Sequence, residues 1–485
     1  MNHLVLMFAL PLLAAFLLPI VARVSAIAGR LLGPLVLAVT AVIGLQAWGV
    51  VADGAVVIAM GGFRPPFGIV FYIDQLALLF AIAVAVVGLL LWPLRSGDAI
   101  PVREYTLTLV LAAAATGLAL SADLFNIYVF YELTAVASYG LAAARGTPAG
   151  YAAVMRYVVI SSLGAGLMLV GIALVYMATG TLNLAQLSQL ASGTLDGPLG
   201  LAAFVFILIG VGVKAELFPV NTWVPEVYGA TSKRVAGLLA GLVSKLALLI
   251  ILRLLVLVFH QPEALQIMLV LGVLGVISGE LAAWRARDLT RMLAFSSIGQ
   301  LGIIFIAFSM PGEGALFAGL AVALHHLLAK PALFLLADRW GGSIERLAGA
   351  ARSAPLAGVL FVLLALSLVG VPPLPGFWAK LLVLIELAGQ DQPLYYFAAF
   401  AILAGAVLEA NYLFRVVGTL YRSAAGQPQP AAHRLPDIAA AGVLGGALLA
   451  CMLLLTPVAE QLEGMAARAA AAVLIVETVN PGARP

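Results

Sequence analysis

The chain of 485 residues is 64% hydrophobic and 10% charged, with 25 basic and 22 acidic side chains and a formal net charge of +3. A soluble domain usually carries charge on about a quarter of its residues, because its surface must be solvated. The composition therefore excludes a soluble enzyme, a nucleic-acid binder and a disordered chain. We predict an all-α integral membrane protein that contacts the lipid bilayer.

Spanning helices are predicted from the apolar stretches, because a helix needs about 20 mostly apolar residues to cross a bilayer. Fourteen stretches meet this condition, at 4–22, 30–52, 70–94, 104–122, 124–144, 153–178, 199–220, 235–259, 264–284, 290–309, 314–337, 355–388, 394–421 and 436–458. The first is preceded by Met-Asn-His and followed by Arg23 and Arg30. Because a signal peptide carries its positive charge ahead of the apolar core, we expect this first helix to be retained.

The basic residues of the connections predict the orientation of the chain. The even-numbered connections carry essentially only Arg64. The odd-numbered connections carry Arg23, Arg30, Arg95, Arg103, Arg145, Lys233, Arg234, Arg285, Arg287, Arg339, Arg346, Arg352, Arg422 and Arg434. Cytoplasmic loops are enriched in Lys and Arg, so both termini are predicted to lie outside the cytoplasm, with the chain in the inner (plasma) membrane. In the tail, the stretch 465–476 is predicted either to form an amphipathic helix or to be a frayed end.

Motifs for cofactor chemistry are absent from the sequence. The single cysteine, Cys451, cannot form an internal disulfide, a thiolate zinc site or an iron–sulfur cluster. Neither a strand-borne GxGxxG nor a GxxxxGK[ST] motif occurs. We expect no cofactor, no metal and no catalytic chemistry in this chain itself.

Ionisable residues inside the predicted spans are the main functional signal. They are Glu132, Lys214, Glu216, Lys245, His325, His326, Lys330, Lys380, Glu386 and Glu409. A charged side chain at the centre of a spanning helix costs roughly 2.5–3.5 kcal/mol, so such a series favours a proton or ion path. The alternative for any single residue is a salt bridge between helices or an extended side chain that reaches the headgroups.

Lysine suits a proton path because desolvation disfavours its charged form, whereas a nearby carboxylate favours it. A Lys–Glu pair of changing separation can therefore take up and release a proton near neutral pH. Glu132 is the natural partner for one of these lysines.

Two predicted spans contain helix-breaking residues beside a lysine. One reads GVGVKAELFPVNTWVPEVYG, with Lys214 five residues before Pro219, and the other reads SLVGVPPLPGFWAKLLVLIEL, with Gly376 shortly before Lys380. Proline in a helix interior removes a hydrogen bond, and at membrane depth the freed backbone must be satisfied by protein or water. A pair of broken spans favours inverted repeats with a transport site between them, and the alternative is two kinked packing helices.

A third span reads LHHLLAKPALFLLADRW. His326 and Lys330 are four residues apart and share a helix face, while Pro331 frees the carbonyl of Leu327. Histidine titrates near neutrality, so His326 and His325 are candidate proton relays, with structural hydrogen bonding as the alternative for each. Two adjacent histidines on a helix cannot both face one ion, so no metal site is predicted.

These segments resemble the antiporter-like membrane subunits of respiratory complex I, of Mrp-type cation/proton antiporters and of energy-converting hydrogenases. The segments that carry the resemblance are LFNIYVFYEL, GVGVKAELFPVNTWVPEVYG, HHLLAKPALFL and GVPPLPGFWAKLLVL. The resemblance implies fourteen helices, with helices 4–8 and 9–13 as two inverted five-helix repeats and helices 7 and 12 broken. The implied domains are 1–103, 104–260, 261–422 and 423–485.

The resemblance also implies roles for individual residues. Glu132 matches the family's glutamate on the fifth helix, and Lys214 matches the lysine of the first broken helix. Lys245 matches the lysine of the eighth helix in one branch of the family. His326 and Lys330 match the central relay, and Lys380 matches the lysine at the second broken helix, toward the exit. Family members usually carry a His and a Pro-rich turn where this chain has Asn221 and Ser232-Lys233-Arg234. Glu216 and Glu409 fall outside the family pattern and are additional candidates.

The predicted function is proton translocation through Glu132, Lys214, Lys245, His325, His326, Lys330 and Lys380, as a subunit of a multisubunit membrane complex. The driving reaction, as in NADH–quinone oxidoreductase or a membrane-bound hydrogenase, would lie in partner subunits. One alternative is an Mrp-type Na⁺/H⁺ antiporter subunit. Another is a structural or coupling subunit of a non-redox complex, such as one for inorganic-carbon uptake.

Overall fold

The computed structural model describes residues 2–52, 54–63, 68–93, 101–340, 342–423 and 434–471. Arg64 and Arg95, which entered the orientation prediction, lie outside these ranges. Residues 472–476 of the predicted tail helix lie outside them as well.

The chain forms two compact units. Unit 1 comprises Met1–Ala215, Leu242–Ala264 and Arg468–Pro485, and unit 2 comprises Glu216–Gly241 and Leu265–Ala467. Each unit therefore contains residues from both of the predicted five-helix repeats. The four predicted domains stay a prediction.

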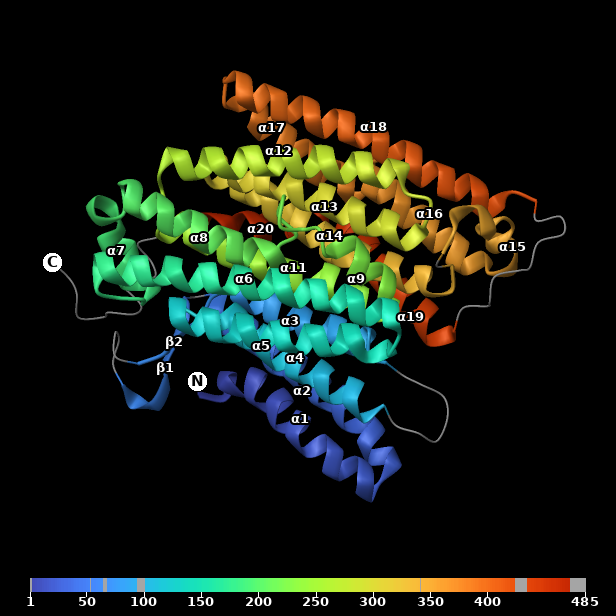
Figure 1. The fold of residues 1–485 in the computed structure, drawn as a ribbon, viewed down its shortest axis with the longest axis horizontal. Coiled ribbons are helices and arrows are strands. Elements are labelled where there is room, and N and C mark those ends of the chain that lie inside the picture. The colour runs from blue at the N-terminus through green and yellow to red at the C-terminus, as the bar shows by residue number, and fades with distance from the viewer. Residues whose placement is uncertain are drawn as a thin grey trace. The chain divides into compact units, whose positions relative to one another are not determined.

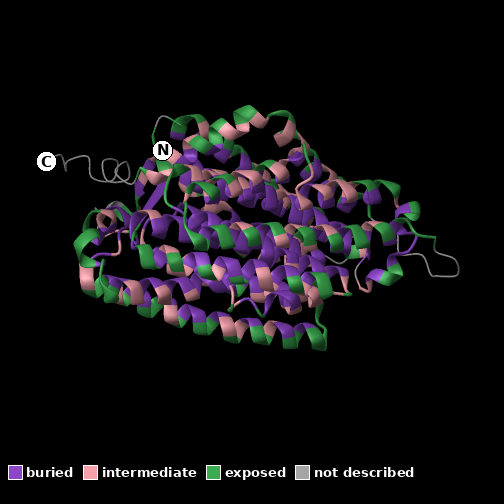
Figure 2. Ribbon diagram, turned by 90° about the horizontal axis from the view of Figure 1, so that it is seen from above, coloured by how far each residue is buried: buried purple, intermediate pink, exposed green. Residues whose placement is uncertain are grey.

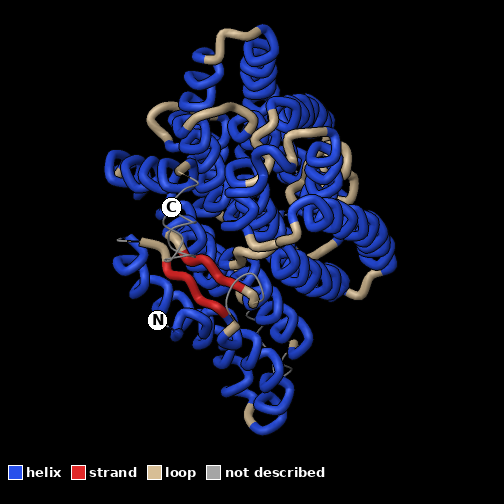
Figure 3. Tube along the Cα trace, turned by 90° about the vertical axis from the view of Figure 1, so that its left-hand side faces the viewer, coloured by secondary structure: helices blue, strands red, loops and turns tan. Residues whose placement is uncertain are grey.

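Unit 1 consists of helices and one small β-hairpin. Its elements are η1 (Asn2–Val5), α1 (Leu6–Val24), α2 (Ala26–Ala52), β1 (Val56–Ala59), η2 (Met60–Gly62), β2 (Val70–Ile73), α3 (Gln75–Leu90), α4 (Val102–Leu120), α5 (Leu124–Ala142), η3 (Ala143–Arg145), α6 (Pro148–Thr179), α7 (Leu184–Thr194), α8 (Pro198–Lys214) and α11 (Ser244–Leu257). Helix α1 packs against α2 and α4, and α6 packs along α8 (Figure 1). The two strands are antiparallel, with Val56 opposite Ile73 (Figure 3).

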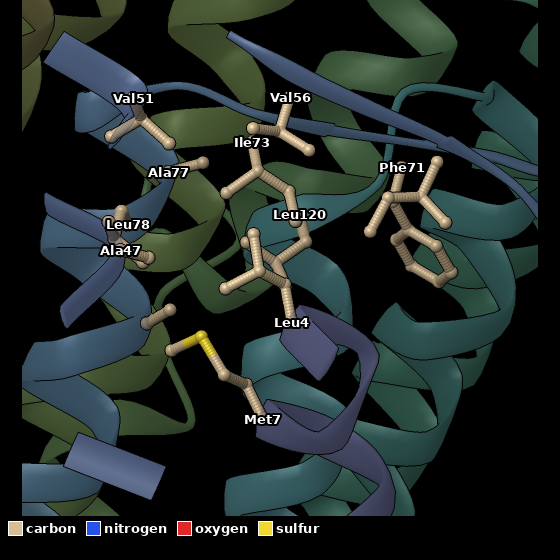
Figure 4. Packing of buried hydrophobic residues seen from close by; sticks show 12 residues of the cluster. Leu4, Met7, Ala47, Val51, Val56, Phe71, Ile73, Ala77, Leu78 and Leu120 are labelled. Atoms are coloured by element: carbon tan, nitrogen blue, oxygen red, sulfur yellow. The ribbon is translucent and has the colours of Figure 1, made fainter. Parts of the chain in front are cut away.

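The hairpin closes an apolar cluster at one end of unit 1. Side chains from α1, α2, α3 and α4 converge there on Phe71 and Ile73 of β2 (Figure 4). Met7, Ala77 and Leu78 in this cluster are fully buried. Alternate residues of the strands face this cluster, so the hairpin anchors the first four helices by side-chain packing.

The named secondary-structure elements in the described residues of unit 2 are all helices. Its elements are α9 (Val224–Ala230), α10 (Lys233–Leu238), α13 (Leu289–Phe308), α14 (Glu313–Trp340), η5 (Ile344–Leu347), α15 (Ala350–Ser353), α16 (Pro355–Val369), α17 (Pro375–Gly389), α18 (Pro393–Tyr421) and α19 (Leu435–Leu453). Three further elements cross the division between the units: the π-helical turn η4 (Leu239–Val243), α12 (Pro262–Arg285) and α20 (Leu455–Ala470). Helix α14 packs against α13, α17 and α19, so it is the central helix of this unit.

The prediction of an all-α membrane fold is confirmed, apart from the hairpin. A helix occupies each of the fourteen predicted stretches. Among the described residues, ten helices are long and apolar enough to cross a membrane, and Gln75–Leu90, Pro198–Lys214 and Pro355–Val369 are shorter apolar helices. Many outer helices carry exposed residues along one side and buried ones along the other (Figure 2). The count of fourteen crossings stays a prediction.

Three predicted boundaries are wrong. The stretch 70–94 begins in strand β2, and its helix starts only after Asp74, whose carboxylate caps Ala77 N at 2.7 Å. The predicted connection 179–198 contains helix α7, which Asn183 caps. The stretch 436–458 is divided at Leu454 between α19 and α20. In each case the residues on both sides of the boundary are similar in polarity, so the sequence pattern does not show where one element ends and the next begins.

Both predicted breaks lie beside their lysines. Helix α8 ends at Lys214, and helical residues resume at Val224. Helix α16 ends at Val369, Gly370 follows with φ of 90°, and α17 begins at Pro375. Glycine accepts this left-handed conformation without the steric cost that other residues pay.

One loop motif occurs twice in the chain. Asp123 caps α5 and pairs by a β-bridge with Asn183, and Asp288 caps α13 and pairs in the same way with Ser343. In each pair the residue after the Asp donates to the carbonyl before its partner, at 2.9 Å for Leu124 and 3.0 Å for Leu289. The repetition supports the proposal that the chain contains two related halves.

Candidate functional site

The predicted site residues are buried, with Glu132 the least so. The exposed fractions are 0% for Lys245, His326 and Lys330, 1% for Lys214, Glu216 and Glu409, 5% for His325 and 7% for Lys380. Glu132 is partly buried. The lysines therefore do not extend toward lipid headgroups.

Lys214 lies in the last turn of α8, in contact with polar and aromatic side chains of unit 1. Its Nζ donates to Ser161 Oγ of α6 at 3.1 Å and lies 3.6 Å from the centroid of the Tyr131 ring on α5. The Tyr131 hydroxyl in turn donates to the carbonyl of Gly210 at 2.6 Å, which fixes the ring against α8. A buried aromatic face stabilises an ammonium group by a cation–π interaction.

Glu132 follows Tyr131 on α5. Its Oε1 is buried and has no hydrogen-bond partner among the described residues. No ion pair between Glu132 and Lys214 is found in the part of the chain that the structure describes. The predicted pairing of Glu132 with one of the lysines therefore stays a prediction.

Lys245 is fully buried on α11, directly after the π-helical turn η4. Its Nζ donates to Ser244 Oγ at 3.0 Å. Such π-helical turns are found at functional sites, because they displace the helix register locally.

In unit 2, Glu216 lies at the first break of the chain. It has φ of 58°, and its Oε1 accepts from the hydroxyl of Tyr228 at 2.6 Å. Asn221 Nδ2 donates to the carbonyl of Glu216 at 3.1 Å. The departure at Asn221 from the family pattern therefore has a structural role, since this amide closes the turn that holds Glu216.

Helix α14 carries the central candidates. Lys330 Nζ donates to Ser296 Oγ at 2.7 Å and to the carbonyl of Leu293 at 3.1 Å, both on α13. His325 Nε2 lies 2.9 Å from Ser367 Oγ on α16, beside an apolar pocket of about 70 Å³. His326 is fully buried one residue further along.

Lys380 lies at the second break and bridges two features of unit 2. Its Nζ lies 2.5 Å from Glu409 Oε2 on α18 and 2.5 Å from the carbonyl of Leu368 in the last turn of α16. The end of a helix leaves carbonyls without donors and carries partial negative charge, so an ammonium is stabilised there. Gln300 Nε2 of α13 donates to the other oxygen of Glu409 at 2.8 Å.

The sequence reasoning missed several polar residues that complete these clusters. In unit 1 they are Tyr131 and Ser161, and in unit 2 they are Ser296, Gln300, Tyr412 and Glu280. Glu280 is the most important omission, because it is a carboxyl group that is only 2% exposed within a spanning helix. It could have been found by extending the search for ionisable residues to the whole of 264–284.

Apolar helices of membrane-spanning length that enclose lysines, histidines and carboxyl groups define a multi-pass membrane protein with a buried ionisable interior. Residues 121–406 match the family described as "NADH:quinone oxidoreductase/Mrp antiporter, TM". The chain belongs to this family.

Relatives in two kinds of complex are similar to this chain. It is 33% identical over 412 residues to NADH-quinone oxidoreductase subunit N of Desulforudis audaxviator (strain MP104C), covering 79% of this chain and 81% of the relative. It is 31% identical to a subunit of the Na(+)/H(+) antiporter of Bacillus subtilis (strain 168), with 78% and 79% covered.

Solved structures agree over nearly the whole chain. A chain of the membrane-bound sulfane sulfur reductase, an archaeal respiratory membrane complex, matches with a TM-score of 0.92 and 29% identity, covering 99% of this chain and 100% of that one. A chain of the Mrp complex from Dietzia sp. DQ12-45-1b matches with a TM-score of 0.88 and 26% identity, with 98% and 99% covered.

Proposed function

We propose that this chain is a proton-translocating subunit of a multisubunit membrane complex. The observation that carries the proposal is the burial of four lysines on four helices, Lys214, Lys245, Lys330 and Lys380, inside a family of proton- and cation-linked membrane subunits. Lipid-facing lysines would cost several kcal/mol each, and lysines enclosed with hydroxyls and carboxylates can exchange protons.

The proposed path has one set of residues in each unit. Unit 1 contributes Glu132, Lys214 and Lys245, and unit 2 contributes Glu216, His325, His326, Lys330, Lys380 and Glu409. Lys380, held by Glu409 and the end of α16, would deliver the proton to the outside. The driving reaction would occur in partner subunits, as the names of the related complexes indicate.

The proposal places the chain in the inner (plasma) membrane with both termini outside the cytoplasm. The helix order and the basic residues of the odd-numbered connections support this orientation. The proposed partners are other membrane subunits of the complex.

The test is Lys214→Met in the purified assembly, reconstituted in vesicles that enclose a pH-sensitive dye. Methionine keeps the length of the side chain and removes the proton site, so proton movement should be lost while the assembly stays intact. The matched control is Lys233→Met, because Lys233 donates to the carbonyls of Tyr228 and Gly229 at the end of α9 and has no place in the path. Proton movement at the wild-type rate in intact Lys214→Met would remove Lys214 from the path.

Sodium exchange is a second candidate function, favoured by the similarity to the Na(+)/H(+) antiporter of Bacillus subtilis (strain 168). Proton movement in the same vesicles should then depend on Na⁺ and stop when K⁺ replaces it. A structural or coupling role predicts no proton movement through this chain under either condition.

A further inference from the structure

Glu280, which the path above does not use, lies in a space that two glycines leave open. A Cβ on Gly299 of α13 would overlap Oε1 of Glu280, and a Cβ on Gly405 of α18 would lie 3.2 Å from Glu280 Cγ. The carboxyl group is thus inserted where α12, α13 and α18 of unit 2 meet. Any larger side chain at Gly299 would displace it.

The contacts of Glu280 include a hydroxyl but no basic side chain. Tyr412 donates its hydroxyl to Glu280 Oε2 at 3.0 Å. Within the described ranges no Lys, Arg or His forms an ion pair with Glu280, and the ionisable groups that act on it are Glu409, Lys380, Tyr412 and Lys330. A buried carboxylate without a directly bonded cation is costly, so the group binds a proton or a compensating cation.

Helix α13 contacts Glu280 and two residues of the proposed path. Ser296 of this helix holds Lys330, Gly299 adjoins Glu280, and Gln300 holds Glu409. These positions fall within about one helical turn, or about 5.4 Å of rise. The groups that contact Lys330, Glu280 and Glu409 therefore lie close together on this helix.

Helix α18 also brings Glu280 and Glu409 together. Gly405, Glu409 and Tyr412 follow the i, i+4, i+7 spacing of one helix face. Glu280 contacts the first and third of these residues, so Glu409 lies on the face that Glu280 covers. In addition, Gln300 Oε1 is buried without a hydrogen-bond partner among the described residues, and such an acceptor needs a donor such as a water or a protonated carboxyl.

We propose that Glu280 is a further proton-carrying residue, which accepts a proton from Lys330 and passes it to Glu409. This inference rests on the proposed function. The neutral carboxyl of Glu280 first gives its proton to Glu409, so that an O–H bond breaks on Glu280 as one forms on Glu409, directly or through a water. An N–H bond of the Lys330 ammonium then breaks as an O–H bond forms again on Glu280. Protonation of Glu409 removes the negative charge that holds the Lys380 ammonium. Lys380 then releases a proton outward and takes up the proton of Glu409.

The first test is Glu280→Gln in the reconstituted assembly. Glutamine keeps the size of the side chain and can accept from Tyr412, but it cannot carry a proton. Proton movement should fall at least about tenfold, since a positioned proton-transfer group contributes 10²- to 10⁴-fold. Glu280→Asp should restore part of the rate. The control Glu263→Gln removes an exposed glutamate in the first turn of the same helix, α12, and should move protons at the wild-type rate.

A second variant keeps Glu280 in the sequence but moves its side chain out of position. Gly299→Ala should lower the rate, and adding Gly299→Ala to Glu280→Gln should lower it no further. Gly418→Ala, on α18 with nothing within 4 Å of its Cβ, is the control. In infrared difference spectra, the C=O stretch of a protonated carboxyl should be present in wild type and lost in Glu280→Gln.

The outcomes separate this inference from the function on which it rests. If Lys330→Met stops proton movement while Glu280→Gln or Gly299→Ala leaves it at the wild-type rate, Glu280 carries no proton and only the present inference is wrong. If neither Lys330→Met nor Glu280→Gln changes the rate, the proposed proton path itself is wrong. If the Glu280→Gln variant does not assemble, the rate of proton movement in Gly299→Ala tests the proposal by itself.

Discussion

The polar partners of the buried lysines differ in kind. Lys214 and Lys330 donate to the hydroxyls of Ser161 and Ser296, whereas Lys380 forms an ion pair with Glu409. Removing one member of a buried ion pair leaves an uncompensated charge, while removing both leaves none. Variants of the Lys380–Glu409 pair can therefore distinguish its effect on the stability of the assembly from its effect on proton movement.

Glu409→Gln should destabilise the assembly by about 3–5 kcal/mol, because it leaves the Lys380 ammonium without its carboxylate. The double variant Lys380→Met/Glu409→Gln should regain most of this stability and still fail to move protons. Thermal unfolding of the purified assembly and the vesicle assay together measure both effects. A double variant no more stable than the single one would mean that the pair is not an isolated source of stability.

The ring of Tyr131 gives a prediction about Lys214. Tyr131→Phe keeps the ring beside the ammonium and loses the hydroxyl that donates to the carbonyl of Gly210, at a cost of about 0.5–1.5 kcal/mol. Tyr131→Leu also removes the aromatic face, which is worth about 2 kcal/mol to a desolvated cation. Proton movement should be near the wild-type rate in the first variant and clearly slower in the second. Equal rates would show that the ring does not affect Lys214.

At the scale of elements, the two helix breaks are caused by residues near them in the sequence, whereas the side chains packed around the breaks come from other helices. Pro219 and the Pro372–Pro375 segment end their helices by removing donors and by steric clash, so the sequence predicts where the breaks fall. What occupies the freed carbonyls is decided by neighbouring helices. At the second break it is Lys380, which the next helix brings back onto the end of α16.

Gly376 is the tightest point of the second break. A Cβ there would overlap the carbonyl oxygen of Ser367 and lie 2.9 Å from His325 Nε2. Because a backbone oxygen cannot move aside as a flexible side chain can, Gly376→Ala should destabilise the assembly by about 1–3 kcal/mol and slow proton movement. Gly389→Ala, at the far end of α17 with open space around it, should do neither. The comparison is made by thermal unfolding and by the vesicle assay.

The β-hairpin is a case in which the local sequence pattern does not predict the secondary structure. The apolar segment Val70–Ile73 runs into an apolar helix, so the two read as one span, although Asp74 caps the helix between them. A short apolar run is compatible with a strand or with a helix, and the choice here follows from pairing with Val56–Ala59.

At the scale of the whole molecule, the basic residues of the loops predict the orientation of the chain in the membrane, whereas helix packing determines which side chains are buried. The predicted orientation places the connection at Arg346 in the cytoplasm and the connection at Gln392 outside. Both residues are exposed and described, which makes them suitable positions for labelling.

The orientation can be measured in a Cys451→Ser background, since Cys451 is the chain's single cysteine. In intact cells, a membrane-impermeant maleimide should label Gln392→Cys and leave Arg346→Cys unlabelled. Permeabilisation should then expose the second position. The reverse pattern would mean that the termini face the cytoplasm.

The sequence alone determined the class of the protein, because apolar runs of spanning length leave a chain no alternative to membrane helices. It also located most of the candidate residues, since a lysine in such a run is costly wherever the helix packs. Glu280 was missed, although it lies within the predicted span 264–284. Only tertiary structure shows that Gly299 and Gly405 admit its carboxyl group to the interior. Burial and hydrogen-bond partners are properties of several helices packed together, and no single segment encodes them.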